Sequence, residues 1–224
     1  MKSRFLMAFM MVAILAPLAT AKKEKTITYK DSTLTDAKYG YTMTVSNNWK
    51  VRAQTEPSTE RAYLEKKNYS VNRMIQTYGG DYTIPTVMLF ATDFNGTVED
   101  FEALLVKSLE EHRTDNEIIS KLGLLQDSEL ITSIESRVDS ITARQIILKR
   151  NYKRLLANDA YGSQSVTQQV EKVINDHEVH EIFAFKKGNT LFVFHAFSER
   201  EFYGKENKAE FEAMAASIAF RSQQ

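Results

Sequence analysis

Residues 181–197, EIFAFKKGNTLFVFHAF, hold the clearest structural signal in this sequence. Two apolar runs, 182–185 and 191–197, flank a Lys-Lys-Gly-Asn segment of the kind that closes a tight β-hairpin. Apolar side chains point to both faces of these strands, so both faces need a cover. The hairpin therefore predicts a central sheet that is shielded from water on both sides.

Two amphipathic segments are available as covers. The first, 97–112, begins with Thr97 at the N-cap and Asp100 in the position that completes a capping box. The second, 205–218, has an apolar stripe at helical spacing. We therefore expect an α+β fold class: a central, mostly antiparallel sheet with helices on both faces, an α/β/α sandwich.

Other segments extend this plan with shorter signals. Alternation over 39–45 and the resumption at Trp49 predict a hairpin in which Trp49 anchors the core. The remaining expectations, in chain order, are a strand at 62–66, a loop at 68–82, a strand at 86–91, a short helix at 117–122, a strand pair at 130–134 and 141–148, and a segment at 151–174 that fits a helix better than a strand.

The first 21 residues indicate export. Lys2 and Arg4 precede an apolar run, and Ala19-Thr20-Ala21 matches a signal-peptidase site with cleavage after Ala21. The run is shorter than the ~20 residues that span a bilayer, although a permanent anchor is the alternative. The predicted organisation is a signal peptide (1–21), a polar lead-in (22–38), a single domain (39–220) and a tail (221–224), in the periplasm or the medium.

The composition excludes several kinds of chemistry and gives no support for polyanionic partners. The chain has no cysteine, which excludes disulfides, a thiol nucleophile and an iron–sulfur cluster. Its 29 basic and 29 acidic residues balance, so its net charge does not favour binding to nucleic acid or to an anionic membrane. We expect no cofactor, no stable membrane insertion once the signal is removed, and an envelope or secreted protein as partner.

Two histidines of the hairpin are the main chemical candidates. If Lys186 lies opposite Asn189, His180 and His195 become cross-strand neighbours, ~5 Å apart at Cβ. With Glu178 or Glu181 they would then form a weak metal-site candidate or a pH sensor. A hairpin closed one residue further on would place His195 opposite Ile182 and remove this site. The alternative is that these are polar residues near the end of a sheet.

The sequence gives little support for nucleophilic catalysis. Gly162-Ser163-Gln164-Ser165 lacks the second glycine of a nucleophile elbow.

One aromatic pair is a candidate contact surface. Phe202 and Tyr203 follow the hairpin and would suit a partner contact, or else pack against the last helix.

Several local features resemble the PsbP/Mog1 family. They are Tyr39-Gly40-Tyr41, Asn48-Trp49-Lys50-Val51, the Lys187-Gly188-Asn189 turn and the ending Ser217-Ile218-Ala219-Phe220. The resemblance covers 39–220. It implies an α/β/α sandwich and a mostly non-catalytic protein, since such domains include accessory subunits of photosystem II, a partner of a nuclear GTPase and exported bacterial proteins.

The sequence thus favours an exported, non-enzymatic accessory or binding protein with an unknown partner. Two alternatives remain. A metal-dependent hydrolase would use the histidine-bearing hairpin, and a small-ligand carrier would hold an apolar ligand between the sheet and its helices.

Overall fold

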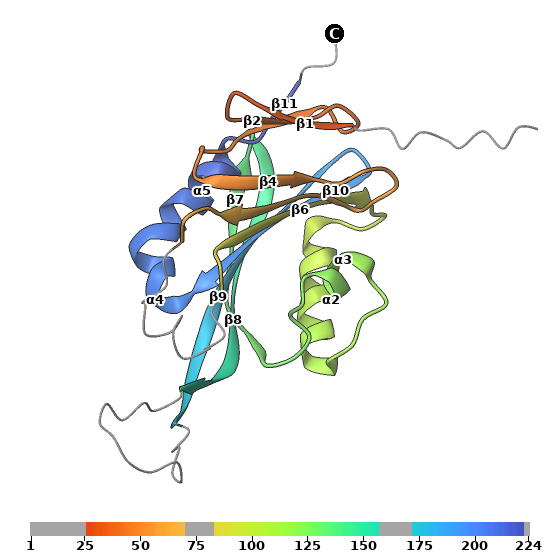
Figure 1. The fold of residues 1–224 in the computed structure, drawn as a ribbon. Helices are drawn as coiled ribbons and strands as arrows, with labels where there is room; N and C mark the ends of the chain where they lie inside the picture. Colours follow the sequence, from red (N-terminus) through yellow and green to blue (C-terminus); the bar gives the residue numbers. More distant parts are fainter. Residues whose placement is uncertain (1–25, 70–82, 157–171, 222–224) are drawn as a thin grey trace, which may run out of the picture.

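A computed structural model describes residues 26–69, 83–156 and 172–221 (Figure 1). The predicted signal peptide with its cleavage site at Ala21, and most of the segments predicted at 68–82 and 151–174, lie outside these ranges. The described parts of the latter, 151–156 and 172–174, are strand, so the expectation of a helix is wrong there. No helix within the described residues has the length and apolar character to cross a membrane.

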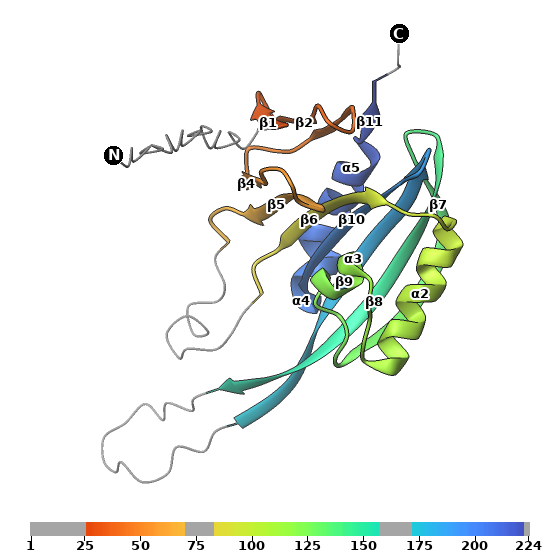
Figure 2. The ribbon, with the colours of Figure 1, turned by 90° about the vertical axis from the view of Figure 1, so that its right-hand side faces the viewer.

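The predicted hairpin is confirmed as β9–β10, and it lies inside a seven-stranded antiparallel sheet of order β4-β5-β6-β10-β9-β8-β7. Both faces of this hairpin are buried because apolar side chains alternate to either side. Beyond the helices, β8 and β9 continue as a long two-stranded ribbon (Figure 2). The strands are β4 (Trp49–Ala53), β5 (Glu60–Lys66), β6 (Thr86–Asp93), β7 (Ser128–Val138), β8 (Ile141–Leu156), β9 (Lys172–Lys187) and β10 (Thr190–Glu199).

A second sheet of four strands, in the order β1-β2-β3-β11, lies over the top of the large one (Figure 1). It joins the two ends of the described chain, because β11 pairs with β3. Two of its strands fall in the segment predicted as a polar lead-in, and Leu34 there is fully buried. The strands are β1 (Ile27–Lys30), β2 (Thr33–Asp36), β3 (Tyr41–Thr44) and β11 (Ala219–Phe220).

The helices pack on both sides of the large sheet, but they are few and short. On one face, α2 (Val98–Glu111) and α3 (Glu117–Lys121) cover a core that includes Phe90 and Ile182. The Thr97–Asp100 capping box is present as predicted. On the other face, α4 (Arg200–Phe202), the π-helical turn η1 (Tyr203–Asn207) and α5 (Lys208–Ala216) lie beside the small sheet.

The predicted α/β/α sandwich is therefore wrong: the protein is mostly β and is built from two antiparallel sheets. The small sheet provides much of the cover that we assigned to helices. Its first two strands have polar composition, and only alternate positions such as Ile27, Leu34 and Asp36 are buried. Their hydrophobic signal is too sparse to recognise without knowing what they pack against.

A buried ion network connects the two sheets. Arg61 on β5 donates from Nε to Asp36 Oδ2 on β2 at 2.8 Å, and neither side chain is exposed. The same guanidinium donates to Thr26 Oγ1 at 2.8 Å and pairs with Glu56. It also lies 5.0 Å from the ring centroid of Tyr39. Every donor group of Arg61 has a partner, and these contacts link β5 of the large sheet to β2 of the small one.

Candidate functional site

The two histidines of the hairpin meet, but in a different register from the expected one. The hairpin closes with Lys187 opposite Thr190, so His195 lies opposite Ile182 and His180 opposite Phe197. We expected this closure to separate the imidazoles. Instead, His180 Nδ1 lies 2.9 Å from His195 Nε2, because diagonal neighbours on one face remain within reach of long or aromatic side chains.

A carboxylate extends this pair into a histidine cluster, defined as Glu178, His180, His195, Thr83 and Arg150. His180 Nε2 lies 3.1 Å from Glu178 Oε2, and Arg150 donates to the same oxygen at 3.3 Å. The Thr83 hydroxyl donates to the other oxygen. Burial alone would raise the pKa of Glu178, but the hydrogen bonds from His180 and Thr83 and the charge of Arg150 together lower it.

Burial dominates the protonation of both imidazoles. It lowers the pKa of His180 and, more strongly, that of His195, which is fully buried. Because Glu178 is ionised, it accepts a hydrogen bond, and we therefore place a proton on His180 Nε2, which donates to the carboxylate. His180 Nδ1 is then unprotonated and accepts from His195 Nε2. His195 Nδ1 then has no proton, and it has no hydrogen-bond partner. The chain of hydrogen bonds therefore ends in a neutral buried acceptor.

Glu181, the third predicted metal-site candidate, points to the opposite face of the sheet. Its carboxylate accepts from Gln145 Nε2 at 2.6 Å and from the Tyr203 hydroxyl at 3.1 Å. Burial raises the pKa of Glu181 despite these two hydrogen bonds. It does not join His180 and His195, and no group of three or more His, Asp or Glu side chains in the described ranges could hold a metal ion.

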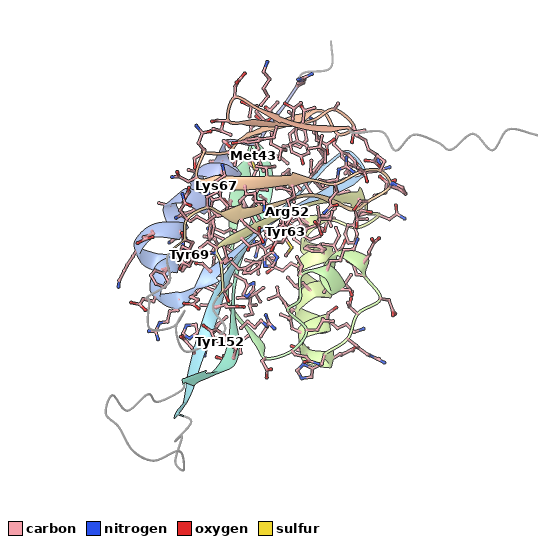
Figure 3. The ribbon with its side chains drawn as sticks, viewed as in Figure 1. Met43, Arg52, Tyr63, Lys67, Tyr69 and Tyr152 are labelled. Atoms are coloured by element: carbon pink, nitrogen blue, oxygen red, sulfur yellow. The ribbon has the colours of Figure 1, made fainter. Side chains whose placement is uncertain are left out.

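The predicted contact pair, Phe202 and Tyr203, is half-buried by the chain's own side chains. Phe202 packs edge-on against Tyr69, with ring centroids 5.4 Å apart, and Figure 3 shows Tyr69 beside α4. Tyr203 contacts Phe211 at 6.4 Å and donates to Glu181. Tyr152, labelled near the lower end of β8, donates to Glu199 Oε1 at 3.4 Å (Figure 3).

A groove at the upper end of the molecule was not predicted. It has a volume of about 740 Å³ and lies between the β2–β3 turn, the β9–β10 turn and β11. We call it the cationic groove. Its principal lining side chains are Lys38, Tyr39, Lys187, Phe192, Phe220 and Arg221.

The floor of the cationic groove is a packed aromatic cluster. The Phe192 ring contacts Tyr39 at 5.7 Å and Phe220 at 5.1 Å, both in edge-to-face arrangements. The Tyr39 hydroxyl donates to the Ala91 carbonyl at 3.4 Å. These contacts hold the rings in fixed orientations, so the floor is formed in advance.

The cations of this groove differ in how they are paired. Lys38 Nζ donates to Glu56 Oε2 at 2.7 Å, and this bond raises the pKa of Lys38. Lys187 Nζ instead lies 4.0 Å from the ring centroid of Phe220. Neither Lys187 nor Arg221 has a carboxylate partner among the described residues. The nearby Asp139 accepts from the Phe220 backbone N–H at 2.8 Å.

Two parts of this groove have a signal in the sequence, but neither signal predicts a groove. Tyr39-Gly40 and Lys187-Gly188 were noted as features of the fold. They meet because β11 pairs with β3 and the Arg221 backbone N–H donates to the Gly40 carbonyl at 2.9 Å. No local sequence signal reports pairing over that separation.

Comparison with solved structures finds similar folds at low identity. The chain is similar to cyanobacterial PsbP (CyanoP) from Synechocystis sp., with 13% identity, a TM-score of 0.47, and coverage of 92% of this chain and 99% of that one. It is also similar to LpqN of Mycobacterium tuberculosis, described as involved in cell envelope biogenesis, with 8% identity, a TM-score of 0.42, and coverage of 81% and 83%. The first of these structures is described as a PsbP protein, which is one of the names of the family that the local sequence features resemble. No protein-family profile and no curated protein matches the sequence.

Proposed function

We propose that this chain is an exported accessory protein that acts by binding, and that the cationic groove is its binding surface. The observation that carries the proposal is the pair of unpaired cations, Lys187 and Arg221, above a preformed aromatic floor. Concave sites lined by aromatic rings with a few charged groups are where proteins bind ligands. The export part rests on the features of residues 1–21.

The buried state of the histidine cluster supports a binding role over a hydrolytic one. Glu178, His180 and His195 are each at most 7% exposed, and they form hydrogen bonds with one another. A general base must come within about 3 Å of a substrate proton, which this depth opposes. We assign the cluster a structural role.

The interior also leaves little room for a carried ligand on the small-sheet side. The hollow bordered by Tyr41, Phe194 and Ile218 holds only about 10 Å³. This space is about that of one water molecule, so ligand binding there would require the core to open. The groove, with a volume of about 740 Å³, is the more favourable site.

Site-specific photo-crosslinking in cells tests the function. A photoreactive residue at Thr190, which lines the groove, is compared with one at Lys107, which lines a separate hollow beside α2. We expect an adduct of discrete mass at position 190 that disappears in a Lys187→Glu background, and none at 107. Equal labelling at both positions, or no adduct at 190, would overturn the proposal.

The export part has its own test. N-terminal sequencing of protein from the periplasm or medium should begin at Lys22. Intact protein that starts at Met1 and stays in the cytoplasm contradicts export without affecting the groove.

A further inference from the structure

We infer that the cationic groove takes a small ligand that combines a planar ring with an anionic group, either a carboxylate or a phosphate. This inference rests on the proposed function, because it specifies what binds at the same groove. It follows from the charge, the floor and the size of the groove.

The charge of the groove favours an anion. Lys187 and Arg221 have no acidic partner among the described residues, and no carboxylate belongs to the groove lining. Of the acids in contact with lining residues, Glu56 pairs with Lys38 and Arg61, Asp36 pairs with Arg61, and Asp139 accepts from the Phe220 backbone N–H. An arginine guanidinium binds carboxylate or phosphate through two parallel hydrogen bonds, and a lysine adds a point charge. Lys187 and Arg221 both line the groove and have no carboxylate partner among the described residues, so we expect both to attract an anionic group that enters it.

The floor favours a ring attached to that anion. Lys187 Nζ already sits over the Phe220 ring, so an anion bound to this ammonium group lies next to aromatic surface. The rings of Tyr39 and Phe220 lie edge-to-face with the largely buried Phe192 ring, at interplanar angles of 83° and 71°. A planar ring gains edge-to-face or stacked contacts there that an inorganic anion cannot make.

The size of the groove and its rims favour a small molecule. A volume of about 740 Å³ falls within the ~300–1,000 Å³ that is typical of small-molecule sites. Gly40 and Gly188, on opposite rims, have φ values of +69° and +61°. Glycine adopts this left-handed conformation without the steric cost that other residues pay, which lets the chain turn tightly at both rims.

A hollow on the other side of Lys38 and Tyr39 provides a contrast within the same molecule. It holds about 430 Å³, and its charged lining residues are Glu56, Asp93 and Glu117 together with Lys38, so acids outnumber bases there. Its acidic lining would repel the same ligand. The predicted ligand therefore binds on the Lys187 side of Tyr39 and not on the Glu117 side.

Calorimetric titration with matched probes tests the inference on the folded protein. The ring with an anion is 1-naphthyl phosphate or 1-naphthoate, the ring alone is 1-naphthol, and the anion alone is inorganic phosphate. We expect either anionic naphthyl probe to bind at least tenfold more tightly than naphthol and phosphate. The two anionic probes separate a phosphate preference from a carboxylate preference.

Variants assign the binding to the groove. Lys187→Met and Arg221→Met should each weaken naphthyl probe binding at least fivefold in low salt, and Lys107→Met in the hollow beside α2 should change it less than twofold. Thermal melting of each variant confirms that it is folded, and both groove cations are on turn or edge positions. Equal losses in all three variants indicate non-specific charge attraction and overturn the inference.

The remaining outcomes separate the ligand class from the proposed function. Naphthol binding as tight as that of the anionic probes overturns the role of charge, and phosphate binding as tight overturns the role of the floor. If no probe binds but the Thr190 adduct forms in cells, the ligand class is wrong and the binding function stands. If both experiments fail, both proposals fall.

Discussion

The two ends of the β9–β10 hairpin manage polar side chains in opposite ways. Away from the turn, the histidine cluster buries its polar groups and pairs them with one another. At the turn, the cationic groove leaves Lys187 and Arg221 in contact with water and without carboxylate partners in the described residues. The hairpin therefore holds at one end a buried network in which His195 Nδ1 lacks a partner, and at its turn an exposed Lys187 that lines the groove together with Arg221 from the end of β11.

The difference shows what burial demands. A buried polar group without a partner loses its hydration and gains nothing in return, so the polar groups of this cluster are paired with one another, with His195 Nδ1 as the exception. A surface cation keeps its water and can exchange it for a ligand. We therefore expect changes in the histidine cluster to alter folding, and changes in the cationic groove to alter binding.

The largest effect is expected from Glu178→Ala. It removes the acceptor shared by His180, Thr83 and Arg150, and breaking a buried pair in this way costs about 3 kcal/mol of unfolding free energy. Urea unfolding measures it. The matched control is Glu110→Ala on the exposed face of α2, where we expect a change below about 0.5 kcal/mol. A loss below about 1 kcal/mol in Glu178→Ala would contradict the structural role of the cluster.

Acidification should destabilise the cluster end next. The folded pKa values of His180 and His195 lie below their ordinary value of 6.5, so below pH 6.5 the unfolded chain takes up protons that the folded chain does not. Above pH 6.5 these two imidazoles do not lower the unfolding free energy. Below it, the unfolding free energy falls as pH drops toward the folded pKa values, by up to about 1.4 kcal/mol per pH unit for each imidazole. Glu181, with a raised pKa, acts in the opposite direction at lower pH.

Urea midpoints at pH 7.5, 6.5 and 5.5 measure this slope. The double variant His180→Leu/His195→Leu should show a flatter profile, whatever its stability at pH 7.5. His112→Leu, at the exposed C-cap of α2, is the control and should keep the wild-type slope. An unchanged slope in the double variant rules out the buried pair as its source.

At the groove end, the turn itself should tolerate less change than its charge. Gly188 has φ of +61°, and a Cβ added there meets nothing within 4 Å, so only backbone strain opposes Gly188→Ala. The expected loss is about 1 kcal/mol. Gly204→Ala, where the Cβ also meets nothing and φ lies outside the left-handed range, is the comparison. Thermal denaturation of both variants should show the loss at Gly188 only.

The smallest effect on folding should come from Lys187→Met. The side chain forms no ion pair with the described residues, so its removal should change the unfolding free energy by less than about 0.5 kcal/mol. The same variant should lose naphthyl probe binding. A substantial loss of stability would show that both ends of the hairpin serve folding, and the contrast would disappear.

Local signals in the sequence predicted much of the large sheet. The β9–β10 hairpin, the Thr97-capped helix and Trp49 as a core residue were recognisable because each depends on neighbouring residues only. The small sheet was not, since polar strands such as β2 are stabilised by what they pack against. The error in fold class follows directly from that omission.

The sites show the same limit. His180 and His195 were paired from hairpin geometry, but their contact is diagonal, and a shift of the turn by one residue was expected to abolish it. Glu181 was grouped with them although alternation places it on the other face. The cationic groove required Phe220 to meet Tyr39, and sequence alone gives no register for a two-residue strand that returns from the far end of the chain.

The pairing of β11 with β3 has a consequence for how the groove is assembled during folding. Phe220 supplies part of the floor of the groove, and Arg221 one of its charges, yet both belong to the last strand or follow it. A growing polypeptide that lacks these two residues has an unfinished small sheet and no groove. Pairing of β11 with β3 and completion of the groove are therefore one event, so a change that releases β11 should open the small sheet and remove the groove together.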